Sequence, residues 1–373
     1  MIHPDLAPSR SRWVVVPFLV VVVLAGLWTG FWFYAASTAD GTLTRWREQE
    51  SRFGRTYTCG SQTTGGYPFR IEVRCADAAA EMRAFQPALM IAAKSLLVVA
   101  QVYDPSLLIG EVTGPMAVTE AGGRDALTAN WQLAQISVRG RPNAPERVSI
   151  VVDDLRLDHG RDGGGTRLAA AAHMELHGRV DPGSTPDSPV ADLVVHLSGA
   201  TAPAIGGVAT QPLDADVTAV LRGLKSFAPR PLPIALRELQ AAGGKLEVSN
   251  ARVTQGETIV QATGSVGLSP NGRLDGTLTV TIVGFDKFIA SIGGLQKVLP
   301  QAAAPSRPAL SAFDRLAPVL GGSGRDQIAA GLLGLLGERT LLDNKPAITM
   351  QLRLTDGAAF LGPIPLGQIP PLY

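Results

Sequence analysis

The charge-free stretch from Trp13 to Ala36 constrains the fold of this chain more than any other feature. At ~1.5 Å per residue, a helix of this length reaches about 36 Å and can cross a bilayer core of ~30 Å. Pro17 falls in the first turns, where a proline is tolerated. We therefore predict a transmembrane helix at 13–36, after a short N-terminal segment at 1–12.

A cleaved signal peptide is the alternative interpretation of this stretch. The small residues Ser37, Thr38 and Ala39 offer a cleavage site directly after it. The apolar core of a cleavable signal is typically about 7–15 residues long, which is much shorter than this stretch. Its length favours an uncleaved membrane anchor.

The flanking charges predict the orientation of the anchor. Arg10 and Arg12 stand directly before the apolar stretch, whereas Arg45 is the first basic residue after it. Because basic residues collect on the cytoplasmic side, we expect residues 1–12 in the cytoplasm and the large C-terminal part on the other side of the membrane. The flanks therefore predict a single-pass membrane protein.

Cys59 and Cys75 are the two cysteines of the chain. In an oxidising compartment such a pair favours a disulfide, although two unrelated buried thiols remain the alternative. A zinc site needs further cysteines or a nearby histidine, and this region offers neither.

The composition favours a β-rich protein that does not bind nucleic acid. The 33 basic and 32 acidic residues nearly balance and are scattered along the chain, so no basic patch marks a nucleic-acid surface. The 41 Gly and 27 Pro suit the turns between many short strands. A hydrophobic content of 46% excludes bulk disorder.

Strand patterns dominate after a polar juxtamembrane helix predicted at 37–56. Ala88–Tyr103 is compatible with a helix or with two buried strands, and its β-rich surroundings favour strands. Two three-strand units then follow the same plan, which predicts antiparallel meanders. Their strands are Val148–Gly160, Thr166–Val180, Ala191–Ser198, Lys245–Gly256, Thr258–Leu268 and Gly272–Val283.

We therefore predict an α+β protein dominated by antiparallel β structure. Its transmembrane helix precedes an elongated sheet of repeated meanders, with a few short helices near the C-terminus. The first β-rich region covers 57–228, and the second covers 229–373 with a helical insert at 285–337. The Pro-rich tail from Gly362 to Tyr373 either packs along the sheet or serves as a partner-binding arm.

The chain resembles a known bacterial family in two places. The charge-free anchor is followed by a polar helix and by Gly66-Tyr-Pro-Phe-Arg-Ile-Glu-Val-Arg-Cys75, and the chain ends on a Pro-rich run through Leu361-Gly-Pro-Ile-Pro365. These features resemble the uncharacterised proteobacterial domain-of-unknown-function family 2125. That resemblance implies a location in the envelope of a Gram-negative bacterium and little chemistry. Together with the flanking charges, it gives the expected location: the bacterial inner membrane, with a single pass and the C-terminal part in the periplasm. More distantly, the plan of an anchor followed by β structure is similar to AsmA-like envelope proteins, a group implicated in moving or organising lipid.

Histidines supply the strongest candidates for chemistry. His173, Glu175 and His177 fall on one face of a predicted strand, and His196 lies on a neighbouring strand. The order H-M-E-L-H differs from the H-E-x-x-H of zinc proteases. A solvated polar face explains the pattern, so we predict no catalytic, cofactor or metal site.

Tyr67, Pro68, Phe69 and Arg70 form the candidate interaction segment, because they place aromatic and cationic groups beside a turn between the two cysteines. The alternative is that this turn only starts the first strand, with Phe69 in the core.

The leading functional hypothesis is a non-enzymatic membrane-anchored protein. Its extended sheet would bind or shield an apolar ligand such as lipid. A scaffolding protein tethered beside an envelope complex is the second hypothesis, and an enzyme of unknown type is the third. An open apolar face would favour the lipid-binding hypothesis, whereas a scaffold is expected to bury its apolar faces.

Overall fold

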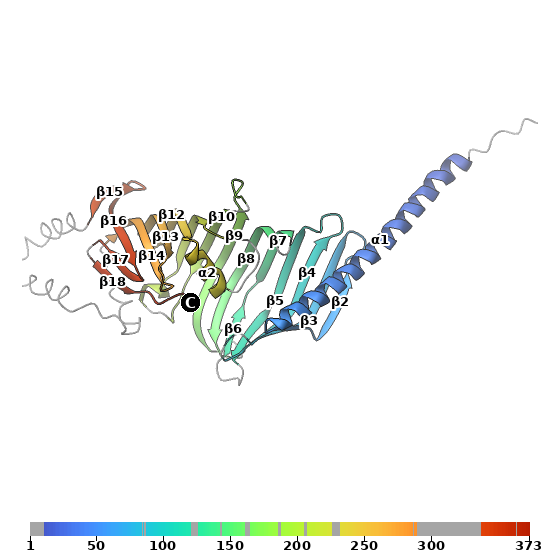
Figure 1. Cartoon of the computed structure of the whole chain (residues 1–373), viewed down its shortest axis with the longest axis horizontal. Coiled ribbons are helices and arrows are strands. Elements are labelled where there is room, and N and C mark those ends of the chain that lie inside the picture. Colours follow the sequence, from blue (N-terminus) through green and yellow to red (C-terminus); the bar gives the residue numbers. More distant parts are fainter. Residues whose placement is uncertain are drawn as a thin grey trace, which may run out of the picture.

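The computed structural model describes residues 11–373 except 84, 86, 121–125, 142–143, 161–164, 186–187, 205–206, 226–231, 286, 289–336 and 363. These residues form one long antiparallel sheet, and a helix projects from one end of it (Figure 1). The helices are α1 (Ser11–Arg52), α2 (Leu232–Ala241) and the short 3₁₀ helix η1 (Gly207–Thr210).

The strands are β1 (Arg55–Thr58), β2 (Ser61–Gly65), β3 (Arg70–Met82), β4 (Leu89–Gln101), β5 (Leu107–Glu120), β6 (Ala126–Asn130), β7 (Leu133–Arg141), β8 (Ala144–His159), β9 (Thr166–Val180), β10 (Ala191–Ala200), β11 (Leu213–Arg222), β12 (Lys245–Gln255), β13 (Thr258–Leu268), β14 (Leu274–Val283), β15 (Glu338–Leu342), β16 (Lys345–Thr355), β17 (Ala358–Leu361) and β18 (Ile364–Gln368).

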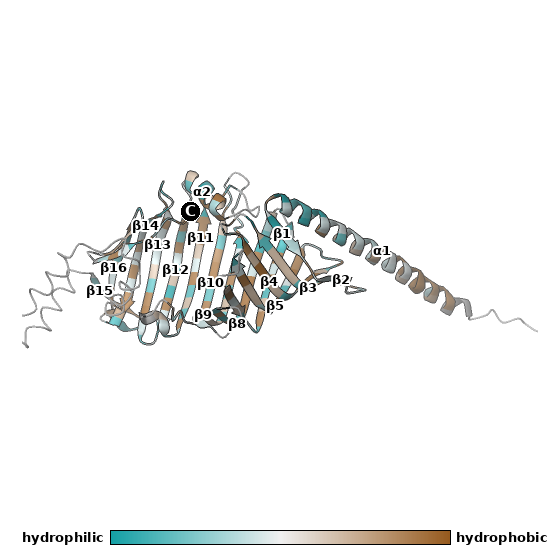
Figure 2. Cartoon of the chain, turned by 90° about the horizontal axis from the view of Figure 1, so that it is seen from below, coloured by the Kyte–Doolittle hydropathy of each residue, from teal (hydrophilic) through white to brown (hydrophobic). Residues whose placement is uncertain are grey.

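Helix α1 joins the two predicted helical segments, 13–36 and 37–56, into one element. Its 42 residues give it a length of about 63 Å at ~1.5 Å per residue. The helix ends where Gly54 adopts a φ of 75°, a conformation that glycine adopts without steric cost. In Figure 2 the projecting half of α1 is hydrophobic and the half beside the sheet is largely hydrophilic.

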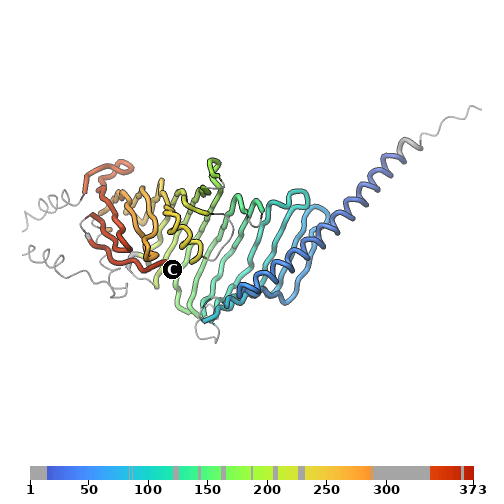
Figure 3. The backbone as a smooth tube through the Cα atoms, viewed as in Figure 1, coloured from blue at the N-terminus to red at the C-terminus, as the bar shows by residue number. Residues whose placement is uncertain are grey.

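The sheet is a meander in which nearly every strand pairs antiparallel with the next along the chain (Figure 3). In three places two short strands lie one after the other along the edge of a longer strand. β1 and β2 both pair with β3, β6 and β7 both lie between β5 and β8, and β15 and β17 both pair with β16. The result is a single elongated sheet, as the repeated strand patterns predict.

The predicted repeat units are confirmed as strands. They correspond to β8, β9 and β10 and to β12, β13 and β14, and each strand pairs with its neighbour in the unit. Between the units β11 pairs with both β10 and β12, so the sheet runs without a break across the predicted boundary near residue 229. Ala88–Tyr103 contains one long strand, β4, where the sequence predicts two.

At the C-terminal end the structure favours the first of the two predictions for the Pro-rich tail, in which the tail packs along the sheet. Residues 289–336, which make up most of the helical insert predicted at 285–337, lie outside the described part of the chain. The Pro-rich tail contains β18, and the Leu372 amide donates a 2.9 Å hydrogen bond to the Gly272 carbonyl. The Tyr373 ring lies under the Arg237 guanidinium of α2, at 5.4 Å. The tail therefore packs against the ends of the strands.

Candidate functional site

One apolar residue from each successive strand lies in a single row across the sheet. The register pairs each member directly with the next: Val73, Val98, Gly110, Ile136, Ile150, Leu176, Val195, Val217, Ala251, Ala262, Val280 and Met350. We call this set the apolar row. At ~4.8 Å between strands it extends for about 50 Å.

Glycine at position 110 keeps this row continuous. A Cβ atom at Gly110 would lie 2.9 Å from Cγ2 of Ile136, closer than side-chain atoms approach one another. The missing side chain therefore makes room for the neighbouring isoleucine of the row.

The neighbouring row of paired residues, one residue along each strand, points to the opposite face and is largely polar. It contains Arg74, Leu97, Glu111, Gln135, Val151, Glu175, His196, Asp216, Arg252, Gln261, Thr281 and Thr349. Successive side chains of a strand point to opposite faces, so the two rows define an apolar and a polar face of one sheet. We use these two names below.

In β11 and β14 the residues of the apolar face are less exposed than their neighbours on the polar face. In β11 the polar-face residues Asp214, Asp216 and Thr218 are exposed, whereas Ala215 and Val217 between them are half-buried. The same alternation recurs in β14, where Thr277 and Thr279 are exposed and Leu278 is half-buried. In β7 and β9 the order is reversed, because Ile136 and Leu176 are exposed whereas Gln135 and Glu175 are half-buried.

Only the two ends of the apolar face are covered by other described elements. At one end Trp32 and Ala36 of α1 are buried with Val102 against Ile71. At the other end Phe285 and Phe288 pack on a buried cluster that contains Val280, Ile282, Ile348, Met350 and Leu361.

In the middle, Ile136 is 38% exposed and Leu176 is 39% exposed. Neither α1 nor α2 makes extensive contacts with β7–β10. Within the described residues, the central part of the apolar face is therefore open, which is the arrangement that an apolar ligand requires.

The candidate interaction segment Tyr67–Arg70 lies against α1. Indole Nε1 of Trp28 donates to the Pro68 carbonyl oxygen, and Nε1 of Trp32 donates to the Arg70 carbonyl oxygen, each at 2.9 Å. The Tyr67 hydroxyl lies 2.8 Å from Thr29 Oγ1, and its ring packs edge-on against Trp32. Phe69 is 63% exposed, so the alternative that places it in the core is wrong.

Two further contacts join the C-terminal half of α1 to the same end of the sheet. Thr64 Oγ1 donates a 2.8 Å hydrogen bond to the Asp40 carboxylate, and the Trp46 ring stacks on Tyr57. The predicted disulfide is present here, with Cys59 between β1 and β2 joined to Cys75 of β3. The junction of helix and sheet is therefore extensively bonded.

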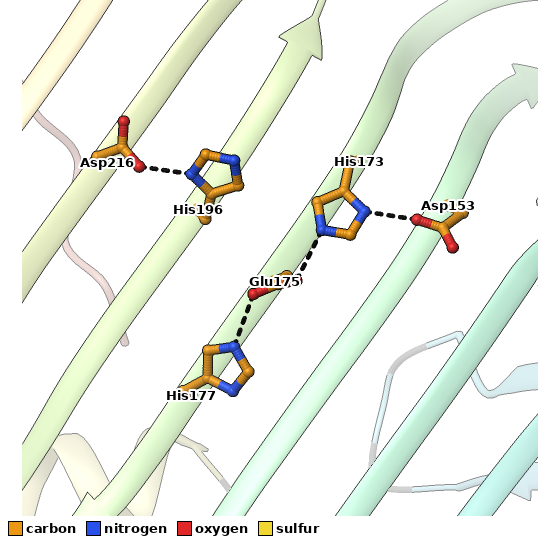
Figure 4. A network of polar contacts seen from close by, with 6 residues as sticks. All are labelled: Asp153, His173, Glu175, His177, His196 and Asp216. Carbon is orange, nitrogen blue, oxygen red and sulfur yellow. Dashed lines mark hydrogen bonds and ion pairs between the residues drawn. The ribbon is translucent and has the colours of Figure 1, made fainter.

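The histidines that the sequence singles out gather on the polar face (Figure 4). His173 contacts Asp153 through Nδ1 at 2.5 Å and Glu175 through Nε2 at 2.8 Å. His177 contacts the other oxygen of Glu175 at 2.9 Å, and His196 lies on the next strand beside Asp216. The strand assignment thus placed His173, Glu175 and His177 correctly on one face.

These contacts shift the pKa values of His173 and Glu175. The hydrogen bond with Asp153, and then that with Glu175, raise the pKa of His173 above its ordinary value. The hydrogen bonds from His177 and His173 lower the pKa of Glu175. The imidazole nitrogens of His173 are thus both occupied by carboxylates of the chain. No group of acidic, histidine or cysteine side chains suited to a metal ion occurs in the part of the chain that the structure describes.

The adjacent aspartates Asp153 and Asp154 lie in β8, and the glycine-rich stretch 161–165 follows this strand in the sequence. Asp153 points toward His173, whereas Asp154 is exposed and adopts a φ of 50°. The glycine-rich loop at 161–165 lies outside the described residues except for Gly165.

Comparison with known families is consistent with this architecture. Residues 32–370 match the family described as an uncharacterized protein conserved in bacteria, DUF2125. The chain belongs to this family. The DUF2125 match begins at Trp32, the residue that bonds α1 to β3, and ends in the tail. Neither a curated protein nor a solved structure matches the chain significantly.

The sequence alone did not reveal the apolar row of this DUF2125 protein. Alternation within each strand was visible, but a row needs the register between strands. The contact of Trp28 and Trp32 with the sheet was also missed. The two tryptophans are four residues apart and so lie on one face of the helix, and this spacing could have predicted a shared contact surface.

Proposed function

We propose that this chain is a single-pass inner-membrane protein whose sheet binds lipid along its apolar face in the periplasm. The observation that carries the proposal is the apolar row, about 50 Å long at ~4.8 Å per strand and open between its two covered ends. Burying a leucine-sized side chain is worth about 1.5–3 kcal/mol, so a row of such residues favours an apolar ligand strongly.

Helix α1 supports the anchoring part of the proposal. It is long and apolar enough to cross a membrane, and its large residues from Val15 to Leu27 are exposed in the structure. Arg10 and Arg12 precede the helix core, which favours the N-terminus on the cytoplasmic side.

The contacts of α1 with the sheet favour an anchor that is retained. Cleavage after Ala39 would remove Trp28 and Trp32, together with their hydrogen bonds to β3 and the adjoining turn. It would also leave Ile71 and Val102 without the indole that covers them. A signal peptide has no need of such contacts with the folded protein.

Site-specific photo-crosslinking tests the lipid-binding proposal. A photoreactive p-benzoylphenylalanine replaces Leu176 on the apolar face, and a matched variant carries it at Val194 on the polar face. Both residues are 39% exposed and lie on adjacent strands, so the two probes differ mainly in the face they occupy.

Irradiation of bacterial membranes, followed by mass spectrometry of the purified chain, is expected to show a phospholipid adduct at position 176 and none at 194. Equal lipid adducts at both positions would show that the probes sample the bilayer without regard to the face. A protein adduct at 176 would instead favour the scaffolding hypothesis.

A further inference from the structure

The free part of α1 is too short to cross a bilayer. Helix α1 first contacts the sheet at Trp28, which bonds to Pro68. The apolar residues before that point, from Trp13 to Leu27, extend about 22 Å at ~1.5 Å per residue. A hydrocarbon core of ~30 Å needs about 20 residues, which places its far boundary near Trp32.

The end of the sheet is bonded to this same stretch of helix. The turn between β2 and β3 contacts Trp28 through Pro68, Thr29 through Tyr67 and Trp32 through Arg70. The turn between β4 and β5 lies beside it, because the Val102 amide donates to the Phe69 carbonyl and Val102 packs against Trp32. If α1 crosses the bilayer, both turns lie at the level of the lipid headgroups.

Exposed aromatic side chains lie on the β2–β3 and β4–β5 turns and on the part of α1 beside them. Phe33 and Tyr34 of α1 are 62% and 69% exposed. In the two turns Tyr67, Phe69 and Tyr103 are 53%, 63% and 67% exposed. Aromatic rings favour the boundary between lipid and water, where an apolar body and a polar edge are both accommodated. In water, the same group of rings would form an unfavourable apolar patch.

We propose that the β2–β3 and β4–β5 turns insert into the headgroup region of the bilayer that α1 spans. The apolar face begins directly beside these turns, at Ile71 and Val73 of β3, so its α1-covered end would lie at the membrane surface. The inference rests on the anchoring part of the proposed function, and it does not depend on whether the sheet holds lipid.

Nitroxide labels on the full chain test this inference. Phe69→Cys and Tyr103→Cys are labelled separately and reconstituted into vesicles of phosphatidylethanolamine and phosphatidylglycerol. Cys59 and Cys75 are joined in the disulfide, so only the introduced thiol reacts. Two reference positions complete the set: Val20→Cys in the apolar part of α1, and Leu341→Cys in the distant β15–β16 hairpin. Leu341 is 69% exposed, which matches Tyr103.

Accessibility to oxygen, which concentrates in lipid, is compared with accessibility to a water-soluble nickel complex. We expect the oxygen-to-nickel ratio at positions 69 and 103 to exceed that at 341 several-fold and to remain below that at 20.

The inference would be overturned if the oxygen-to-nickel ratios at positions 69 and 103 equal the ratio at position 341. A high ratio at position 20 in the same experiment would still support the membrane anchor. A low ratio at 20 would instead refute the anchor itself. Labels at 69 and 103 that neither reagent reaches would indicate a covering protein, which also overturns the inference.

Discussion

Trp32 donates its indole N–H to the carbonyl oxygen of Arg70 at 2.9 Å and thereby joins α1 to the first long strand of the sheet. The Trp32 side chain is 5% exposed and packs with Ala36 and Val102. The apolar N-terminal helix and the sheet therefore share a buried cluster. They form one structural unit, rather than a tether followed by an independent domain.

Removal of this indole is expected to destabilise the chain. Trp32→Ala deletes a large buried side chain and leaves the Arg70 carbonyl without its donor, and such changes cost about 3–5 kcal/mol. Urea unfolding of the detergent-solubilised chain, followed by the circular dichroism of the strands, measures the loss. Phe33→Ala is the matched control, because Phe33 is the next residue of α1 and is 62% exposed. Equal midpoints for the two variants would refute the structural role of Trp32.

The mature protein is expected to retain its N-terminal helix. The contacts of Trp28 and Trp32 with the sheet exist only if residues 1–39 stay attached. Intact-mass measurement of the chain purified from bacterial membranes should show no loss of residues 1–39. A mature chain that begins just after Ala39 would contradict the prediction.

The elements that the sequence predicted well are those set by local chemistry. The charge-free stretch at Trp13–Ala36 had to be helical if it lay in a membrane, because backbone groups in lipid must bond within the segment. The strands of the two repeat units were visible because their side chains alternate between apolar and polar. The pairing of Cys59 with Cys75 followed from the presence of two cysteines and is confirmed.

The elements that the sequence did not predict depend on distant contacts. β18 lies in a Pro-rich tail, where its proline-rich composition argued against a strand. The short strands β1 and β2 become strands because both pair with β3. The sequence also contains no local sign that α1 continues through residue 37. The apolar N-terminal half and the polar C-terminal half of α1 look like two separate helices.

The disulfide is expected to stabilise the fold measurably. Cys59 and Cys75 are 16 residues apart, and closing a loop of this length contributes about 3 kcal/mol in the chain-entropy model. Cys59→Ala together with Cys75→Ala should lower the free energy of unfolding by about that amount. The double variant should also be insensitive to a reductant that destabilises the wild-type chain. If a reductant shifts both chains equally, the bond does not carry this stability.

Histidine 173 is expected to make stability depend on pH above its ordinary titration range. Its pKa is raised in the folded chain, chiefly by the hydrogen bond with Asp153. The charged form therefore stabilises the fold fully below the unfolded pKa of about 6.5, and the contribution is lost as pH rises through the folded pKa.

Nuclear magnetic resonance titration of the five histidines, labelled selectively, measures this pKa directly. Asp153→Asn should lower the His173 midpoint, because the carboxylate that favours the charged ring is gone. His196→Asn is a suitable comparison, since His196 lies nearby without a hydrogen bond to His173 and is paired with Asp216. A His173 midpoint that Asp153→Asn leaves unchanged would contradict the proposed cause.

The structure of the full chain in lipid nanodiscs, determined by electron cryomicroscopy, tests the central claim most directly. The account predicts elongated density along the apolar face beside Ile136 and Leu176, and none on the polar face beside Val194. An apolar face that is covered by protein along its whole length, with no such density, would contradict lipid binding by this sheet.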